Sequence, residues 1–185
     1  MPDATPAPAN RYQEKFGSPS GRAATKVIDH LDDYVRAFIG KSPFVVMASA
    51  NAQGQCDASP KGGYPGFVKV LDERHLLLPD VRGNKLFQSY ENIDGNAQVG
   101  LVFFIPGIDT TARVNGTAQV VDDEDLKARG ISMEVFDPDD NAALQQGLLI
   151  EVQEAYPHCT RALKFSRLWD TDVIDTNRTT PPVTR

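Results

Sequence analysis

The sequence has little cysteine and histidine, no surplus of positive charge and no long apolar run. Its 185 residues include two cysteines and three histidines, and 19 basic residues stand against 25 acidic ones, for a net charge of −6. General nucleic-acid binders show clustered Lys and Arg on a basic domain, so the charge excludes that class of partner. The longest apolar runs, such as 99–106, reach about half of the roughly 20 residues that a membrane-spanning helix needs, which excludes a membrane protein.

The scarcity of Cys and His also argues against a metal site. Cys56 and Cys159 lie far apart and form no CxxC pair, and the three histidines show no metal-ligand spacing. The first ten residues are rich in proline and lack the apolar core of a signal peptide, so we expect a cytoplasmic protein. A disulfide is disfavoured in that compartment.

The length corresponds to one domain, and a hydrophobic content of 41% is sufficient for a packed core. We expect an extended N-terminal tail over 1–22, a folded domain over 23–174 and a C-terminal tail over 175–185. Both ends are rich in proline, and the last stretch is also rich in threonine.

Helical periodicity is confined to a few segments. Residues 24–39 place their apolar side chains on one face and are followed by Gly40, which predicts a helix that covers one side of a core. A second helix is expected to begin near Lys85 and to run to about Asn92, and a third to span 157–168.

From residue 44 the pattern is typical of β-strands. Strands are predicted over 44–50, a short segment through Ala58, 67–71, 75–78, 98–105, 111–121 and 148–154. Short strands joined by close turns, with few helices, indicate an α+β fold: a small antiparallel, Greek-key-like β-barrel with covering helices.

The segment 57–66 is predicted to be a loop at the rim of this barrel. Pro60 cannot donate to a sheet ladder, and glycines such as Gly62 allow a backbone to approach a ligand closely. Ser59 and Lys61 add polar side chains. The segment is either a ligand-binding loop or a rim loop without a ligand.

The segment 78–85 combines a strand end, a glycine turn and a helix start. A helix N-terminus presents free N–H groups and a partial positive charge, and Arg82 and Lys85 add two full charges. This combination indicates a phosphate site. Alternatively, Asn84 caps the helix and both cations are merely solvated.

Three further positions allow two interpretations each. Arg113, on a predicted strand, is either exposed to water or a third cation of the same site. His158 and Cys159 could form a thiolate with a local base, but adjacent side chains do not easily face each other, so a structural pair is favoured. Trp169 either anchors the C-terminal segment or stacks on a planar ligand.

Six segments occur in an order typical of one protein family. They are SPFVVMASA (42–50), CDASPKG (56–62), PGFV (65–68), LPDVRGNK (78–85), GLVFFIPG (100–107) and RVNG (113–116). Together they resemble the pyridoxamine 5′-phosphate oxidase-related flavoproteins, over about 27–169. The segment HCTRALKFSRLW (158–169) resembles the ending of one bacterial branch of that family.

The resemblance implies an FMN-binding split β-barrel that forms a homodimer with FMN at the subunit interface. It implies phosphate contacts at Arg82, Asn84 and Lys85, ring contacts at Ser59, Pro60, Lys61 and Gly62, a ring edge at Leu78 and Pro79, and further contacts at Arg113 and Trp169.

The expected function is that of an FMN-dependent oxidoreductase, which transfers a hydride between flavin N5 and a small organic substrate or a nicotinamide donor. No catalytic side chain is required, because N5 itself accepts the hydride. The alternatives are a non-catalytic protein that binds, stores or senses FMN, and a split barrel that uses haem or F420. Residues 122–140 hold eight acids and two bases and so carry the whole negative surplus, whereas 57–85 has five bases and four acids.

Overall fold

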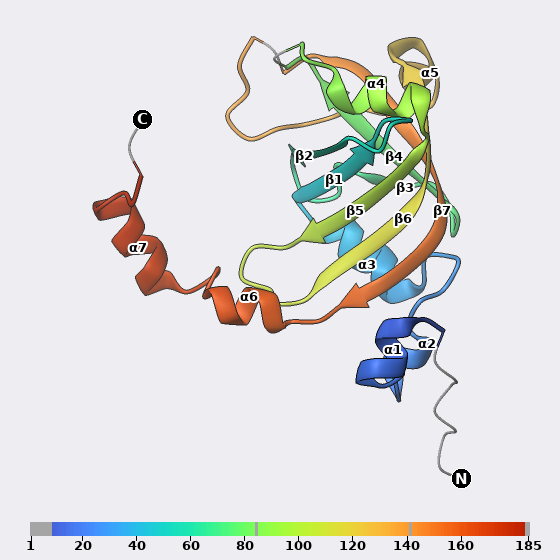
Figure 1. The fold of residues 1–185 in the computed structure, drawn as a ribbon. Coiled ribbons are helices and arrows are strands. Elements are labelled where there is room, and N and C mark those ends of the chain that lie inside the picture. Colours follow the sequence, from blue (N-terminus) through green and yellow to red (C-terminus); the bar gives the residue numbers. More distant parts are fainter. Residues whose placement is uncertain (1–8, 84, 141, 184–185) are drawn as a thin grey trace.

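Seven strands form one antiparallel sheet in the computed structural model, which describes residues 9–83, 85–140 and 142–183. The strands are β1 (Phe44–Ala50), β2 (Cys56–Gly62), β3 (Lys69–Val70), β4 (His75–Val81), β5 (Gln98–Phe104), β6 (Thr111–Asp122) and β7 (Leu144–His158). Their order is β2-β1-β5-β6-β7-β4-β3, so β2 and the short β3 are the edges. The sheet curls into a barrel that is split between these edges (Figure 1).

The helices lie at the ends and on the outside of this barrel (Figure 1). They are α1 (Arg11–Phe16), α2 (Arg22–Thr25), α3 (Asp33–Lys41), α4 (Gln88–Gly95), α5 (Asp123–Ala128), α6 (Arg161–Ser166) and α7 (Thr171–Thr179). Within the described ranges, none of these helices is long and apolar enough to cross a membrane.

The apolar core fills the curled sheet. Alternate residues of the central strands point inward, and Val45, Met47, Leu101 and Phe103 are at most 1% exposed. α3 contributes three buried apolar side chains to this core, and α4 contributes Ile93. The architecture confirms the predicted α+β fold, an antiparallel split barrel with covering helices.

A smaller apolar cluster lies outside the barrel. Part of the acidic segment 122–140 forms the helix α5, which packs in this cluster. Leu126 of α5 packs against Leu77 of β4 and Val121 of β6. Asp122 is the N-cap of α5, and its Oδ1 accepts a hydrogen bond of 2.9 Å from the N–H of Asp125. Three more acids occupy the first turn, where carboxylates stabilise the helix dipole.

The prediction of a loop over 57–66 was wrong for its first half, because β2 continues to Gly62 and includes Pro60. Pro60 pairs with Val46 of β1, and β2 has no strand on its other side. A proline is tolerated in such an edge strand because no neighbour needs its missing N–H. The segment therefore has the regular alternation of a strand, with Ser59 and Lys61 on one face.

The single helix predicted over 24–39 is interrupted. α2 ends at Thr25, and Ile28 then forms a β-bridge with Ala155 of β7 through two backbone hydrogen bonds of 2.7 and 3.2 Å. α3 begins after Asp32, whose carboxylate accepts a hydrogen bond of 2.8 Å from the N–H of Val35. Pairing with β7 and the new N-cap override the helical periodicity.

The C-terminal helix predicted over 157–168 begins later, at Arg161. β7 runs to His158 because Thr111 of β6 remains its partner there. Helices also replace part of the extended chain predicted for both tails: α1 follows the N-cap Asn10, and α7 follows Asp170.

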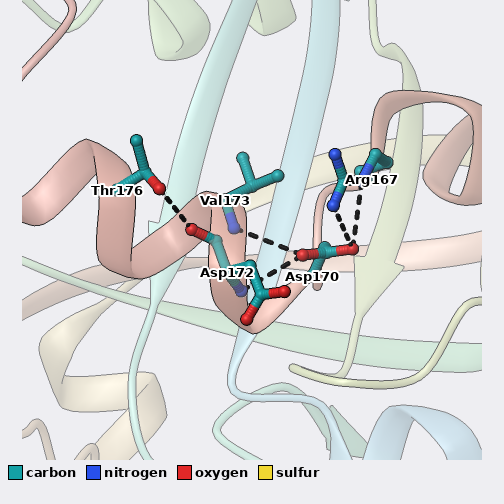
Figure 2. Close-up of polar contacts among 5 residues, drawn as sticks. All are labelled: Arg167, Asp170, Asp172, Val173 and Thr176. Carbon is teal, nitrogen blue, oxygen red and sulfur yellow. Dashed lines mark hydrogen bonds and ion pairs between the residues drawn. The ribbon is translucent and has the colours of Figure 1, made fainter.

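α6 and α7 extend away from the barrel (Figure 1). Arg167 donates two hydrogen bonds of 2.8 and 3.0 Å to Asp170, whose other carboxylate oxygen accepts from the N–H groups of Asp172 and Val173 (Figure 2). The N–H of the Trp169 ring donates to the backbone oxygen of Ile108 at 3.1 Å. This contact anchors the segment to the β5–β6 turn.

Candidate functional site

A pocket of about 270 Å³ opens where the edge strand β2, the end of β4 and the start of α4 meet. The residues that line it are Asp57, Ala58, Ser59, Pro60, Lys61, Asp80, Val81, Gly83, Lys85, Leu86, Phe87, Gln88, Ser89 and Tyr90. The pocket thus brings together residues of the two predicted site segments, 57–66 and 78–85. It lies at the split of the barrel.

An ion pair joins the two sides of the split. Lys61 Nζ on β2 lies 3.0 Å from Asp80 Oδ2 on β4, and the side chains are 17% and 18% exposed. Tyr90 of α4 donates its hydroxyl to the same oxygen at 2.9 Å. Burial raises the pKa of Tyr90 well above its usual range, and the charge of Asp80 adds to the effect. Tyr90 is therefore a neutral donor, and Asp80 holds both Lys61 and α4 in place.

Two further hydrogen bonds position α4 over the barrel. Ser89 donates to Asp57 on β2 at 2.6 Å. The buried Asn92 donates its amide N–H to Ser49 Oγ on β1 at 3.0 Å. The start of α4 is consequently fixed relative to the pocket wall.

Among the described residues, no side chain caps the N-terminus of α4, which opens into the pocket. Phe87 precedes the helix in a left-handed conformation (φ 51°), and the first helical bond runs from the N–H of Glu91 to its carbonyl. By helix geometry, the N–H groups of Gln88, Ser89 and Tyr90 have no acceptor within the helix. Lys85 lines the same pocket and is exposed. These donors and this ammonium group suit an anion.

The structure brings four of the predicted site residues together: Ser59, Pro60, Lys61 and Lys85 all line the pocket. Leu78 and Pro79 are buried within β4, two residues and one residue before Asp80. Gly62 ends β2 beyond the lining residues. Asn84, the predicted helix cap, lies outside the described residues.

Three of the predicted cofactor contacts lie away from this pocket in the single chain. Arg82 borders a shallow depression formed with Asp137 and Asp139. Arg113 lies on the outer face of β6, with its guanidinium carbon 5.4 Å from the ring centroid of Tyr156. Trp169 binds the β5–β6 turn, as described above. The helix predicted to begin near Lys85 begins at Gln88 in the structure. Lys85 (φ 62°) and Phe87 have left-handed backbone conformations, which do not continue an α-helix.

Four polar residues that organise the pocket are not among the predicted site residues: Asp57, Asp80, Ser89 and Tyr90. Asp80 had a usable signal, because it follows Leu76 and Leu78 at the strand period of two and so points toward the barrel interior. Ser89 and Tyr90 carry no such sequence signal, because they lie on a helix and their partners lie on the strands β2 and β4.

Cys56 and Cys159 are free and exposed. Cys159 accepts a hydrogen bond from the N–H of Arg161. Over the described ranges, no three His, Cys, Asp or Glu side chains are grouped to hold a metal ion.

Comparison with known proteins identifies the family. A family model described as pyridoxamine 5′-phosphate oxidase matches residues 31–159. The chain belongs to this family. The part that matches the pyridoxamine 5′-phosphate oxidase model runs from just before α3 to the end of β7, so it includes all seven strands and the whole pocket. α1, α2, α6 and α7 lie outside it.

A solved structure shares the fold of this chain. A Lactobacillus delbrueckii structure named for pyridoxamine 5′-phosphate oxidase is 24% identical, with a TM-score of 0.51 over 71% of this chain and 99% of that one. A Listeria innocua structure of the same name is 19% identical, with a TM-score of 0.48 over 68% and 95%. HupZ of Group A Streptococcus is 15% identical, with a TM-score of 0.47 over 68% and 91%. No curated protein matches the sequence.

Proposed function

We propose that the pocket binds FMN and that the protein is an FMN-dependent oxidoreductase. The observation that carries this proposal is the uncapped N-terminus of α4, which opens into the pocket beside Lys85. FMN carries one phosphate group, and one helix N-terminus with one ammonium group provides the donors that such a group needs. The family and fold support the same cofactor class.

Within this proposal each wall of the pocket has a defined part. Lys85 and the first N–H groups of α4 bind the phosphate. Ser59, Pro60 and Lys61 of β2 flank the remainder of the cofactor. Asp80 keeps Lys61 oriented, and Tyr90 keeps Asp80 oriented through its hydroxyl.

When bound, FMN supplies a hydride acceptor and donor, which suits a small organic substrate or a nicotinamide donor. The side chains then need only bind and orient the reactants. The two carboxylates in the pocket are already engaged, Asp57 by Ser89 and Asp80 by Lys61 and Tyr90. Neither is presented as a free base.

A homodimer belongs to this proposal for two reasons. The volume of about 270 Å³ lies below the roughly 300–1,000 Å³ of pockets that enclose a drug-sized ligand, so one chain does not enclose a whole flavin. The outer face of β1 and β5 is also apolar: Phe44 is 39% exposed, its ring centroid lies 5.9 Å from that of Phe104, and Val46 and Val102 are half-buried. A second copy packed on this face would cover it. The proposed location is the cytoplasm, in keeping with two free, exposed thiols.

Titration of the purified protein with FMN and with riboflavin tests the proposal. The two ligands differ by the phosphate, so we expect FMN to bind at least about tenfold more tightly, the effect of a charge-assisted hydrogen bond. Oxidation of NADH or NADPH by the FMN-loaded protein would distinguish an oxidoreductase from a storage or sensing protein. Protein that takes up no FMN, or that binds haem or F420 in its place, would contradict the proposal.

A further inference from the structure

Three basic side chains surround Tyr156 on the outer face of β6 and β7. The ring centroid of Tyr156 lies 5.1 Å from Lys26 Nζ and 5.4 Å from the guanidinium carbon of Arg113. The ring of His158 lies 6.2 Å away, centroid to centroid. Lys26 follows α2, Arg113 is on β6 and His158 ends β7, so the fold assembles this cluster from three parts of the chain.

Two buried nitrogen atoms of the cluster, Arg113 Nε and His158 Nδ1, have no hydrogen-bond partner among the described residues. The Nε of an arginine always carries a hydrogen and is always a donor. Buried polar groups in folded proteins are nearly always paired, so an unpaired donor indicates a missing acceptor. His158 Nδ1 needs an acceptor as well when that nitrogen carries the proton, and one anion could serve both atoms.

The positive charge of the cluster is also unbalanced. Within the described ranges, Lys26, Arg113 and His158 form no ion pair with a carboxylate. The acid two residues before Tyr156, Glu154, accepts a hydrogen bond of 2.8 Å from the amide of Asn115. Burial lowers the pKa of His158, and the charges of Arg113 and Lys26 lower it further. An anion would satisfy the donors and offset this repulsion.

The cluster is separate from the pocket within one chain. Asp80 pairs in register with Gln146 of β7, whereas Arg113 pairs with Tyr156. The two positions lie ten residues apart on β7, which is roughly 30 Å along an extended strand. None of the three basic residues lines the pocket.

We propose that Lys26, Arg113 and His158 form a second binding site, which takes an oxyanion group, a phosphate or a carboxylate, beside Tyr156. Arg113 donates Nε–H to the anion, and Lys26 adds an ammonium group. His158 donates through Nδ1. Within one chain the site shares no residue with the pocket.

The test is a titration of the flavin-free protein with inorganic phosphate, and separately with acetate, followed by NMR of the Arg113 Nε–H and of the His158 ring. We expect both signals to shift with one common affinity. Lys26→Gln and Arg113→Gln should each weaken phosphate binding about tenfold, since each removes one charge-assisted contact. Two charge-matched controls, Arg129→Gln on the surface and Lys85→Gln in the pocket, should leave that affinity unchanged.

Phosphate that shifts neither signal would overturn the proposal. The same holds if Lys85→Gln, and not Lys26→Gln, removes the response, because the anion would then bind in the pocket. Lys26 is a half-buried loop residue, so its variant keeps the test valid even if Arg113→Gln does not fold. A response to phosphate without one to acetate would assign a phosphate group to the site, and the reverse a carboxylate.

Discussion

Asp80 connects the two sides of the split in the barrel. It accepts from Lys61 across the split and from Tyr90 of the covering helix, and the ion pair is more than four-fifths buried. Removing one partner of such a pair leaves an uncompensated charge.

We therefore expect Asp80→Asn to lower the free energy of unfolding by about 2–3 kcal/mol. A denaturant titration of Asp80→Asn, Lys61→Gln and the double variant measures the coupling between the two groups. The control is Asp29→Asn, which breaks an exposed pair with Arg74 and should change stability little. Equal effects at positions 80 and 29 would contradict the structural role of Asp80.

We predict different losses of FMN affinity for variants of Lys85 and Arg82, although the two residues are only three positions apart. Lys85 lines the pocket, whereas Arg82 borders the depression with Asp137 and Asp139. If Lys85 holds the phosphate, Lys85→Gln should weaken FMN binding by about 1.5–3 kcal/mol. Arg82→Gln should weaken it much less, and neither variant should affect riboflavin. Isothermal titration calorimetry with both ligands checks this. A larger effect of Arg82→Gln would favour the phosphate contact that the family resemblance implies for Arg82.

At the scale of single elements, two of the capped helices, α5 and α7, have opposite surroundings. Asp122 caps α5, whose Leu126 is fully buried, and Asp170 caps α7, which buries no side chain (Figure 2). Loss of an N-cap typically costs about 1 kcal/mol of helix stability. That cost is felt by the whole fold only where the helix is packed against it.

Asp122→Ala should therefore lower the global free energy of unfolding by about 1 kcal/mol. Asp170→Ala should leave global unfolding unchanged and increase amide hydrogen exchange within α7 alone. Denaturant unfolding and residue-resolved hydrogen exchange measure the two effects. Global destabilisation by Asp170→Ala would show that α7 packs on another surface in solution.

The sequence predicts the existence of the strands and of the helix before β1 better than it predicts where these elements end. Alternating apolar residues identify β1 and β5, because inward-facing positions are set by the strand period alone. The ends depend on partners: β7 continues to His158 because Thr111 pairs with it, and Pro60 fits in β2 because that strand is an edge. The helix predicted over 24–39 breaks where Ile28 pairs with β7. Such pairings are tertiary and leave no local signal.

The pocket shows the same division. The segments 57–66 and 78–85 are predicted as site segments from their prolines, glycines and cations, and the pocket is lined by residues from 57–61 and 80–90. The contacts that join them, Lys61 to Asp80 and Ser89 to Asp57, depend on closure of the barrel. Arg113 is predicted in the same site by its charge and by the family resemblance, and in the single chain it lies beside Tyr156.

At the scale of the whole molecule, the proposed homodimer would complete the proposed flavin site. Phe44, Val46, Val102 and Phe104 form an apolar face on β1 and β5, adjacent to the edge strand that lines the pocket. A glutamate in this face would bury an unpaired charge in the proposed dimer but would be solvated in a monomer. Assembly and cofactor binding should therefore fail together.

We expect Phe44→Glu to convert a dimer into a monomer and to weaken FMN binding at least about tenfold, since the part of the flavin outside the pocket loses its cover. Light scattering after gel filtration gives the mass, and an FMN titration gives the affinity. Phe165→Glu is the matched control, because Phe165 is 73% exposed and lies on α6, outside β1 and β5. A wild-type monomer that binds one FMN with undiminished affinity would refute the shared site, and the cofactor would then have to lie along β2 within a single chain.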